Sequence, residues 1–176
     1  HIHGAEALLR WEHPVAGRIT SPLMVKLAEE ESFLDELGLY IIEEACRDAQ
    51  KFQKEGKPLS ISVNISPKQL ESAVFVREVR RILQEVDLHD IQLILEVTER
   101  SLLSTSHRIL ERIRELKQMG IQMSMDDFGM GHSSMMYLQE NAFDEVKLDG
   151  SLVRQILENE RSQDIVRGIT RLAASM

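Results

Sequence analysis

Residues 91–129 of the chain read "IQLILEVTERSLLSTSHRILERIRELKQMGIQMSMDDFG", and this stretch decides the fold. Ile91–Glu99 is apolar at most positions, which is typical of a strand covered on both faces. Arg108–Gly120 carries apolar residues at helical spacing and closes on a glycine. The strand-like run that follows ends in two adjacent aspartates, Asp126 and Asp127. A strand, a helix and a second strand in this order predict two parallel strands joined by a helical crossover.

The same alternation continues on both sides of this stretch. Further strands are predicted at Gly4–Trp11, Leu59–Ser66 and Phe143–Asp149, and a loop is predicted over residues 11–22. Ser66 and Pro67 are typical of a helix start. Other helices are predicted at about Leu23–Glu31, Leu34–Glu55, Val74–Val86, Ser133–Asn141 and Asp164–Ser175. Strands that alternate with helices in this way predict an α/β fold built on a parallel sheet.

The composition is that of a single globular domain, with 43% hydrophobic and 28% charged residues over 176 positions. The formal net charge of -8 argues against a general binder of DNA or RNA, which usually presents a basic face. It is compatible with an anionic substrate if bound cations reverse the local charge. No apolar stretch has the length of a membrane span, and no signal-peptide pattern opens the sequence. The single cysteine, Cys46, excludes an internal disulfide, is interpreted as a core residue and fits a reducing cytoplasm.

Each predicted strand carries a distinctive polar residue at or near its carboxyl end. Parallel strands bring these ends to one edge of the sheet, where (β/α) barrels hold their active sites. Oxygen-bearing side chains, without other cysteines or a clear histidine pair, favour a hard divalent cation such as Mg²⁺ or Mn²⁺. Two such ions need a bridging carboxylate and a second carboxylate beside it, which explains the adjacent aspartates. The polar residues are Glu6, Asn64, Glu96, Glu99, Asp126, Asp127, Lys147 and Asp149.

Five of these residues also have a simpler interpretation when each is taken alone. Glu99, Asp127 and Asp149, taken singly, are typical caps of a following helix. Asn64 alone is a typical turn residue, and Lys147 alone is typical of a solvated surface. The coincidence of such residues on five predicted strands favours a functional site.

Five motifs read together resemble the EAL domain family. They are "EALLRW" (6–11), "VNIS" (63–66), "LEVTE" (95–99), "DDFGMGHSS" (126–134) and "VKLD" (146–149), in the order that the family shows. The resemblance implies a TIM-type (β/α) barrel that is incomplete here, with about five of the eight strands and without the first and the last two. Residues 1–176 are therefore expected to form a partial EAL domain. Its two open sheet edges suggest an excerpt of a larger protein or a fragment that pairs with a second copy.

The resemblance implies a phosphodiesterase that hydrolyses cyclic di-GMP to linear pGpG with two Mg²⁺ or Mn²⁺ ions, with Ca²⁺ as an inhibitor. The implied metal ligands are Glu6, Asn64, Glu96, Asp126 and Asp127. The implied catalytic residues are Glu6, Asp127 and Lys147, and Lys147 would contact the attacking water or the phosphate. The implied substrate contacts are Leu8, Arg10 and Asp149. Glu99 would hold the loop of residues 126–134.

Two functions of different classes stay open at this stage. One is the enzyme, although we expect weak or absent turnover from this chain alone, because no residue replaces a glutamate and a glutamine of the missing strands. The other is a non-catalytic EAL module that binds cyclic di-GMP or a protein partner. Met130 and His132 stand where the family usually has threonine and tyrosine, which concerns regulation and removes no metal ligand.

The resemblance also implies a setting. It points to a bacterial, cytoplasmic protein that forms a homodimer. Family members are often fused to sensory or diguanylate cyclase-like domains, and some to membrane segments.

Overall fold

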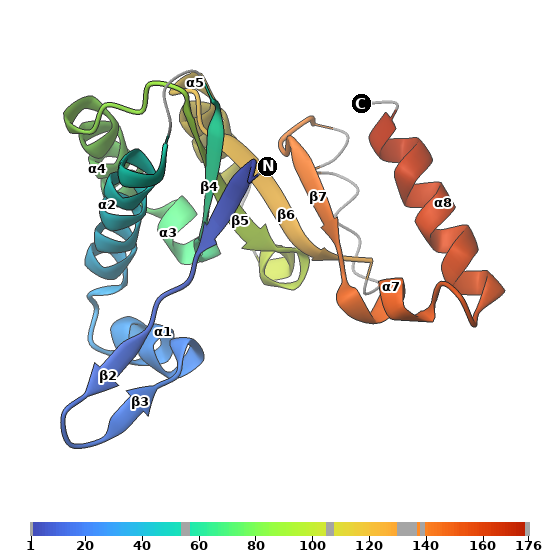
Figure 1. The fold of residues 1–176 in the computed structure, drawn as a ribbon, viewed down its shortest axis with the longest axis horizontal. Helices are drawn as coiled ribbons and strands as arrows, with labels where there is room; N and C mark the ends of the chain where they lie inside the picture. The colour runs from blue at the N-terminus through green and yellow to red at the C-terminus, as the bar shows by residue number, and fades with distance from the viewer. Residues whose placement is uncertain (1, 54–56, 105–107, 130–136, 138–139, 175–176) are drawn as a thin grey trace.

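The structure, a computed structural model, describes residues 2–53, 57–104, 108–129, 137 and 140–174. These residues form a five-stranded parallel sheet in the order β1-β4-β5-β6-β7, which confirms the predicted α/β fold (Figure 1). The strands are β1 (Gly4–Ala7), β4 (Leu59–Asn64), β5 (Ile91–Thr98), β6 (Gln122–Phe128) and β7 (Glu145–Leu148).

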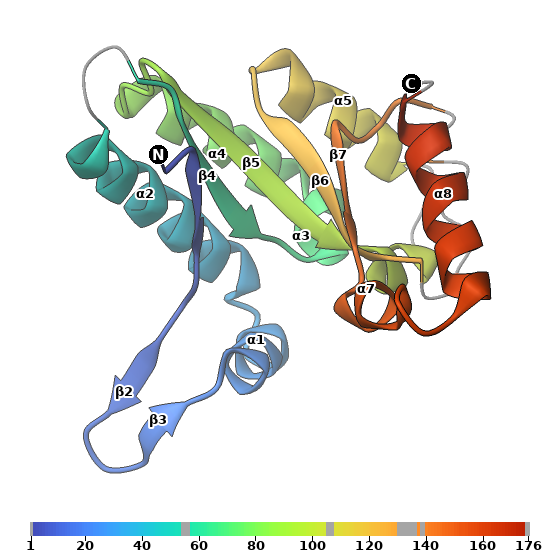
Figure 2. The ribbon, with the colours of Figure 1, turned by 45° about the vertical axis from the view of Figure 1, so that its right-hand side comes forward.

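One layer of helices covers one face of this sheet (Figure 2). The layer consists of α2 (Leu34–Phe52), α3 (Pro67–Glu71), α4 (Ala73–Glu85) and α5 (Arg108–Gln118). The Ser66 side chain accepts a hydrogen bond from the backbone N–H of Gln69 and caps α3, as predicted. The helix predicted at Ser133–Asn141 lies largely outside the described residues.

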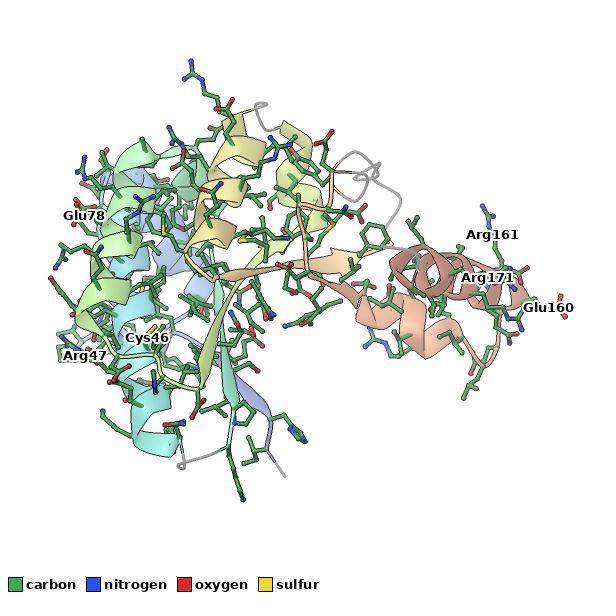
Figure 3. The ribbon with its side chains drawn as sticks, turned by 90° about the horizontal axis from the view of Figure 1, so that it is seen from above. Cys46, Arg47, Glu78, Glu160, Arg161 and Arg171 are labelled. Carbon is green, nitrogen blue, oxygen red and sulfur yellow. The ribbon has the colours of Figure 1, made fainter. Side chains whose placement is uncertain are left out.

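Two short helical elements were not predicted, because they are too short to show a periodic pattern. They are the 3₁₀ helix η1 (Glu99–Ser104) and α7 (Gly150–Gln155). The last helix, α8 (Glu160–Ala174), begins earlier than predicted. It projects away from the helical layer, as the labelled positions of Glu160, Arg161 and Arg171 show (Figure 3).

The prediction was wrong for the segment that follows β1. The strand ends at Ala7 rather than Trp11, and the predicted loop contains an antiparallel hairpin of β2 (Trp11–His13) and β3 (Gly17–Ile19). His13 Nδ1 closes the turn by accepting hydrogen bonds from two backbone N–H groups, at 3.2 and 3.0 Å. The hairpin strands are too short for an alternating pattern to be visible in the sequence. Helix α1 (Ser21–Glu30) follows the hairpin and lies beside it, away from the sheet (Figure 1).

Strand alternation sorts the side chains of the sheet onto two faces. The face toward the helices is apolar and belongs to a core that includes Val63, Leu95, Met123 and Met125. Cys46, on α2, is buried in the same core, as predicted (Figure 3). The opposite face carries serine, amide and acidic side chains, and it holds the candidate site.

The two edges of the sheet are β1 and β7, so the described residues do not close the barrel that the resemblance implies. A cavity of about 660 Å³ lies at the β1 edge. Apolar side chains of β1, α2 and β4 line most of it, among them Ala5, Ala49 and Ile61. Within the described part of the chain, no helix is both long and apolar enough to cross a membrane.

Candidate functional site

The candidate site occupies the polar face of the sheet, toward the carboxyl ends of the strands. Asn64 is the register partner of Glu96 on β5. The residue two positions before Asn64, on the same face of β4, is the register partner of Glu6 on β1. Asp126 on β6 is the register partner of Thr98, which lies two residues after Glu96 on the same face of β5. The four oxygen-bearing side chains therefore share one face and climb it diagonally. The stagger of neighbouring strands in (β/α) barrels produces such a diagonal.

Glu6 and Asn64 form the first pair of the site. Asn64 is the last residue of β4, and its Nδ2 donates a hydrogen bond to Glu6 Oε1 at 2.7 Å. Because the amide nitrogen faces the carboxylate, the amide oxygen is left as an acceptor. Carboxylate and amide oxygens are both suitable ligands for a hard cation.

Glu96 and Lys147 form the second pair. Glu96 is 1% exposed, and its Oε1 accepts a hydrogen bond from Lys147 Nζ within an ion pair. Burial by itself would lower the pKa of Lys147, but the hydrogen bond to Glu96 and the charges of Glu96 and Asp126 raise it by more. The pKa of Lys147 therefore lies above its ordinary value, and the lysine stays protonated. Glu96 Oε2 is buried and has no hydrogen-bond partner among the described residues. A buried carboxylate oxygen without a partner is costly, and a bound cation would satisfy it.

Asp126 and Asp127 lie at an irregularity in the sheet. Met125 pairs with Val146 and Phe128 pairs with Leu148, so the two aspartates together lie opposite Lys147 alone. Asp127 has a φ of 55°, in the left-handed region that aspartate tolerates better than most residues. In an uninterrupted strand, adjacent side chains point to opposite faces. The extra residue removes that alternation, in the manner of a β-bulge.

The electrostatics of Asp127 reflect this crowding. Partial burial, and then the negative charges of Asp126 and Asp149, raise the pKa of the Asp127 carboxyl above its ordinary value. Three carboxylates thus repel one another at the carboxyl ends of β6 and β7. A divalent cation would relieve this repulsion.

Asp149 and Glu99 have well-defined structural contacts. The Asp149 side chain accepts hydrogen bonds from the hydroxyl and the backbone N–H of Ser151, the latter at 2.7 Å, and caps α7. These bonds lower the pKa of Asp149. Glu99 is 1% exposed, and its Oε2 accepts a hydrogen bond from the backbone N–H of Gly129 at 3.0 Å. Glu99 therefore holds the backbone directly after β6, where the predicted loop role would place it.

The two remaining predicted substrate contacts lie apart from these pairs. Leu8 is 53% exposed in the connection between β1 and β2. Arg10 is exposed, and its Nη1 donates to the carbonyl oxygen of Leu9 at 2.9 Å. Among the described residues, no hydrogen bond or ion pair joins Arg10 to the acidic side chains. Met130 and His132, which were singled out in the sequence, lie outside the described residues.

Sequence reasoning missed a buried polar residue that stands next to Glu96 on this face. Ser124 is the direct register partner of Glu96, it is 0% exposed, and its hydroxyl has no hydrogen-bond partner in the described part of the chain. In the sequence it looks like an ordinary small spacer in an alternating strand. Only the pairing of β5 with β6, which no local pattern specifies, reveals its position.

The donor set of this face fits a hard divalent cation, but the side chains are arranged in pairs. Oxygen ligands, one orphaned buried carboxylate oxygen and a repelling aspartate pair are what such a site requires. Among the described residues, no three acidic, histidine or cysteine side chains converge on one point. The candidate ligands therefore share a face without forming a closed coordination sphere.

Fold and site together define a class of protein. It is the class of parallel α/β proteins that gather acidic and amide side chains at the carboxyl ends of their strands. The EAL domain model matches residues 1–176, and the chain belongs to the EAL domain family.

Three similar proteins illustrate this relationship. The chain is 39% identical over 175 residues to an uncharacterized signaling protein of Caulobacter vibrioides, covering 99% of this chain and 21% of that protein. It is 33% identical over 176 residues to the cyclic di-GMP phosphodiesterase NbdA of Pseudomonas aeruginosa, covering 99% of this chain and 22% of that protein. The solved structure of the PaMucR phosphodiesterase in complex with c-di-GMP superposes with a TM-score of 0.82 at 35% identity. That match covers 98% of this chain and 70% of the PaMucR chain. The chain thus spans about a fifth of the length of these two curated relatives.

Proposed function

We propose that this chain forms the cation-binding part of a phosphodiesterase that hydrolyses cyclic di-GMP to linear pGpG. The observation that carries the proposal is the diagonal of oxygen ligands on one sheet face, which ends at two aspartates opposite Lys147. The names of its relatives support the same activity, since NbdA is a cyclic di-GMP phosphodiesterase and PaMucR was solved with c-di-GMP.

The proposed ligands divide into two groups that share Asp126. Glu6, Asn64 and Glu96 would hold the first ion with Asp126, and Asp127 would hold the second ion with Asp126. When bound, two Mg²⁺ or Mn²⁺ ions supply a water of lowered pKa and positive charge near the attacking and leaving oxygens. EAL phosphodiesterases depend on metal ions in general, and the choice of these two ions is part of the proposal.

The other residues would position groups and bind the substrate. Lys147 holds the Glu96 carboxylate and keeps further N–H groups that can donate to the attacking water or to a phosphate oxygen. Arg10 carries a planar guanidinium that suits two phosphate oxygens, and its exposure leaves it accessible to substrate. Glu99 fixes Gly129, where the chain leaves β6. We also propose that Leu8 and Asp149 line the substrate side of the site.

The decisive experiment incubates the protein with cyclic di-GMP and Mg²⁺ or Mn²⁺ and measures pGpG by chromatography. The experiment is run on the 176-residue chain and on the full-length protein, if the full-length protein is longer. Asp126→Asn and Glu96→Gln should each lower turnover by roughly a hundredfold or more, because both remove a charged ligand. Asp87→Asn is the matched control, since Asp87 is exposed and precedes β5 at the opposite end of the sheet.

The possible outcomes separate the two classes of function. Product that depends on Asp126 and Glu96 supports the enzyme. If both the 176-residue chain and the full-length protein bind cyclic di-GMP but release no product with either ion, the enzyme hypothesis is refuted and the non-catalytic receptor is supported. Ca²⁺ should permit binding and inhibit turnover, because its longer and looser coordination suits two closely spaced ions poorly. The homodimer and the sensory or cyclase-like partner domains stay predictions, to be tested by the mass in solution and by the flanking sequence.

A further inference from the structure

The inference starts from two buried polar atoms that lie next to each other without partners. Glu96 and Ser124 are paired in register on β5 and β6, so their side chains stand side by side on the polar face. Glu96 is 1% exposed and Ser124 is 0% exposed. Among the described residues, Glu96 Oε2 and the Ser124 hydroxyl oxygen each have no hydrogen-bond partner.

The chemistry of the two groups is complementary. An ionised carboxylate oxygen only accepts hydrogen bonds, and a serine hydroxyl donates one. Paired residues of neighbouring strands lie about 4.8 Å apart, a distance that a rotation of the two side chains can bridge. Leaving both groups buried and unpaired is unfavourable, so their pairing removes two penalties at once. Lys147 already holds the other oxygen of Glu96, and a bond from Ser124 would fix the carboxylate from a second side.

We propose that Ser124 is a positioning residue whose hydroxyl donates a hydrogen bond to Glu96 Oε2 and orients that carboxylate toward the bound cation. This inference rests on the proposed function, in which Glu96 is a ligand. The Oε2 atom has two lone pairs, so it can accept from Ser124 and bind a cation at the same time. Groups that orient a metal ligand in this way typically change metal affinity by about 10-fold to 100-fold when they are removed.

The test measures Mn²⁺ affinity by isothermal titration calorimetry and, separately, the urea midpoint of the metal-free protein. Ser124→Ala removes the hydroxyl and keeps nearly the same volume. We expect about 10-fold to 100-fold weaker Mn²⁺ binding and a lower urea midpoint of the metal-free protein, because Glu96 Oε2 loses its proposed partner. Ser124→Thr keeps a hydroxyl and should restore most of the affinity. Ser60→Ala is the matched control, because Ser60 lies on the same face at the start of β4, far from the carboxyl ends.

The outcomes distinguish this inference from the function on which it rests. If the unaltered protein binds Mn²⁺ and Ser124→Ala binds it equally well, the role of Ser124 is overturned and the proposed function stands. If the unaltered protein binds no Mn²⁺, both are overturned. A loss of affinity that Ser60→Ala reproduces would show a general effect of the substitution and would also overturn the role of Ser124.

Discussion

At the scale of single residues, the adjacent aspartates show that like charges repel one another in the candidate site. Asp127 lies at φ 55° beside Asp126 and Asp149, and its pKa is raised by burial and by both charges. Because the folded-state pKa is above the unfolded value, this carboxyl has no effect on stability while it is protonated in both states, and it disfavours the folded chain once it is ionised. Its effect on stability becomes unfavourable as the pH rises from 3.8 through the raised pKa.

Asp127→Asn should therefore raise the thermal midpoint of the metal-free protein at pH 7. Asparagine tolerates the left-handed backbone and removes one of the three repelling charges. The gain should shrink as the pH is lowered toward 4, where the native carboxyl takes up its proton. Scanning calorimetry between pH 4 and 7 measures it, with Asp87→Asn as the control. A lower midpoint for Asp127→Asn than for the unaltered chain at pH 7 would contradict the argument.

Cys46 gives a second prediction, which concerns the core. Burial raises the pKa of its thiol from 9.0 to about 11. The unfolded chain therefore ionises first as the pH rises, and stability is lost between about pH 9 and 11, by roughly 2–3 kcal/mol at most. Urea unfolding should show this loss in the unaltered protein but not in Cys46→Ala. Rapid alkylation of Cys46 in the native state at pH 8 would show that the thiol is accessible and would refute the prediction.

At the scale of elements, one side chain of α3 links the start of α2 to the backbone that follows β4. Gln69 is 3% exposed, its Nε2 donates to the carbonyl oxygen of Leu34 at 2.9 Å, and its Oε1 accepts from the backbone N–H of Ser66 at 2.8 Å. Gly38 leaves room for this amide, because a Cβ there would lie 1.9 Å from Gln69 Nε2. The start of α2 and the backbone that follows Asn64 are thereby held together.

Gly38→Ala should destabilise the protein by about 1–3 kcal/mol, since the added methyl displaces the Gln69 amide from both bonds. Gly168→Ala is the matched control: it makes the same substitution within α8, where a Cβ meets nothing within 4 Å. There the better helix propensity of alanine should stabilise by up to about 1 kcal/mol. Urea unfolding measures both, and equal effects of the two substitutions would contradict the packing argument.

Elements differ in how far the sequence reveals them. The period of α4 and the apolar run of β5 were enough to place both elements within one residue at each end. The β2–β3 hairpin could not be predicted because each of its strands has only three residues. The register shift at Asp126 and Asp127 could not be predicted because it depends on pairing with β7, which lies later in the chain.

At the scale of the whole molecule, the site depends on contacts that no local pattern contains. Lys147 and Glu96 are 51 positions apart, and Glu6 and Asn64 are 58 apart, yet each pair is in direct contact. The sequence could place these residues at strand ends and on one sheet. It could not show that they meet in pairs, or that Ser124 lies against Glu96, because strand pairing and register are tertiary properties.

The same arrangement would make the proposed cation binding a property of the entire sheet. The proposed ligands come from β1, β4, β5 and β6, and β1 is an edge strand whose one partner among the described strands is β4. A bound ion would tie this edge to the centre of the sheet. At a free Mn²⁺ concentration of 100 times its dissociation constant, we expect the free energy of unfolding to rise by about 2.7 kcal/mol. Asp126→Asn should abolish most of this gain.

Hydrogen exchange can show where that stabilisation acts. Mn²⁺ should slow the exchange of β1 amides, because Glu6 lies in this strand and local opening of the edge would break its bond to the ion. Amides of α8, which carries no proposed ligand and projects away from the helical layer, should exchange at an unchanged rate. Asp126→Asn should remove the protection of β1. Equal slowing of β1 and α8, or slowing that persists in Asp126→Asn, would mean that the ion binds elsewhere and that the diagonal of side chains is not its site.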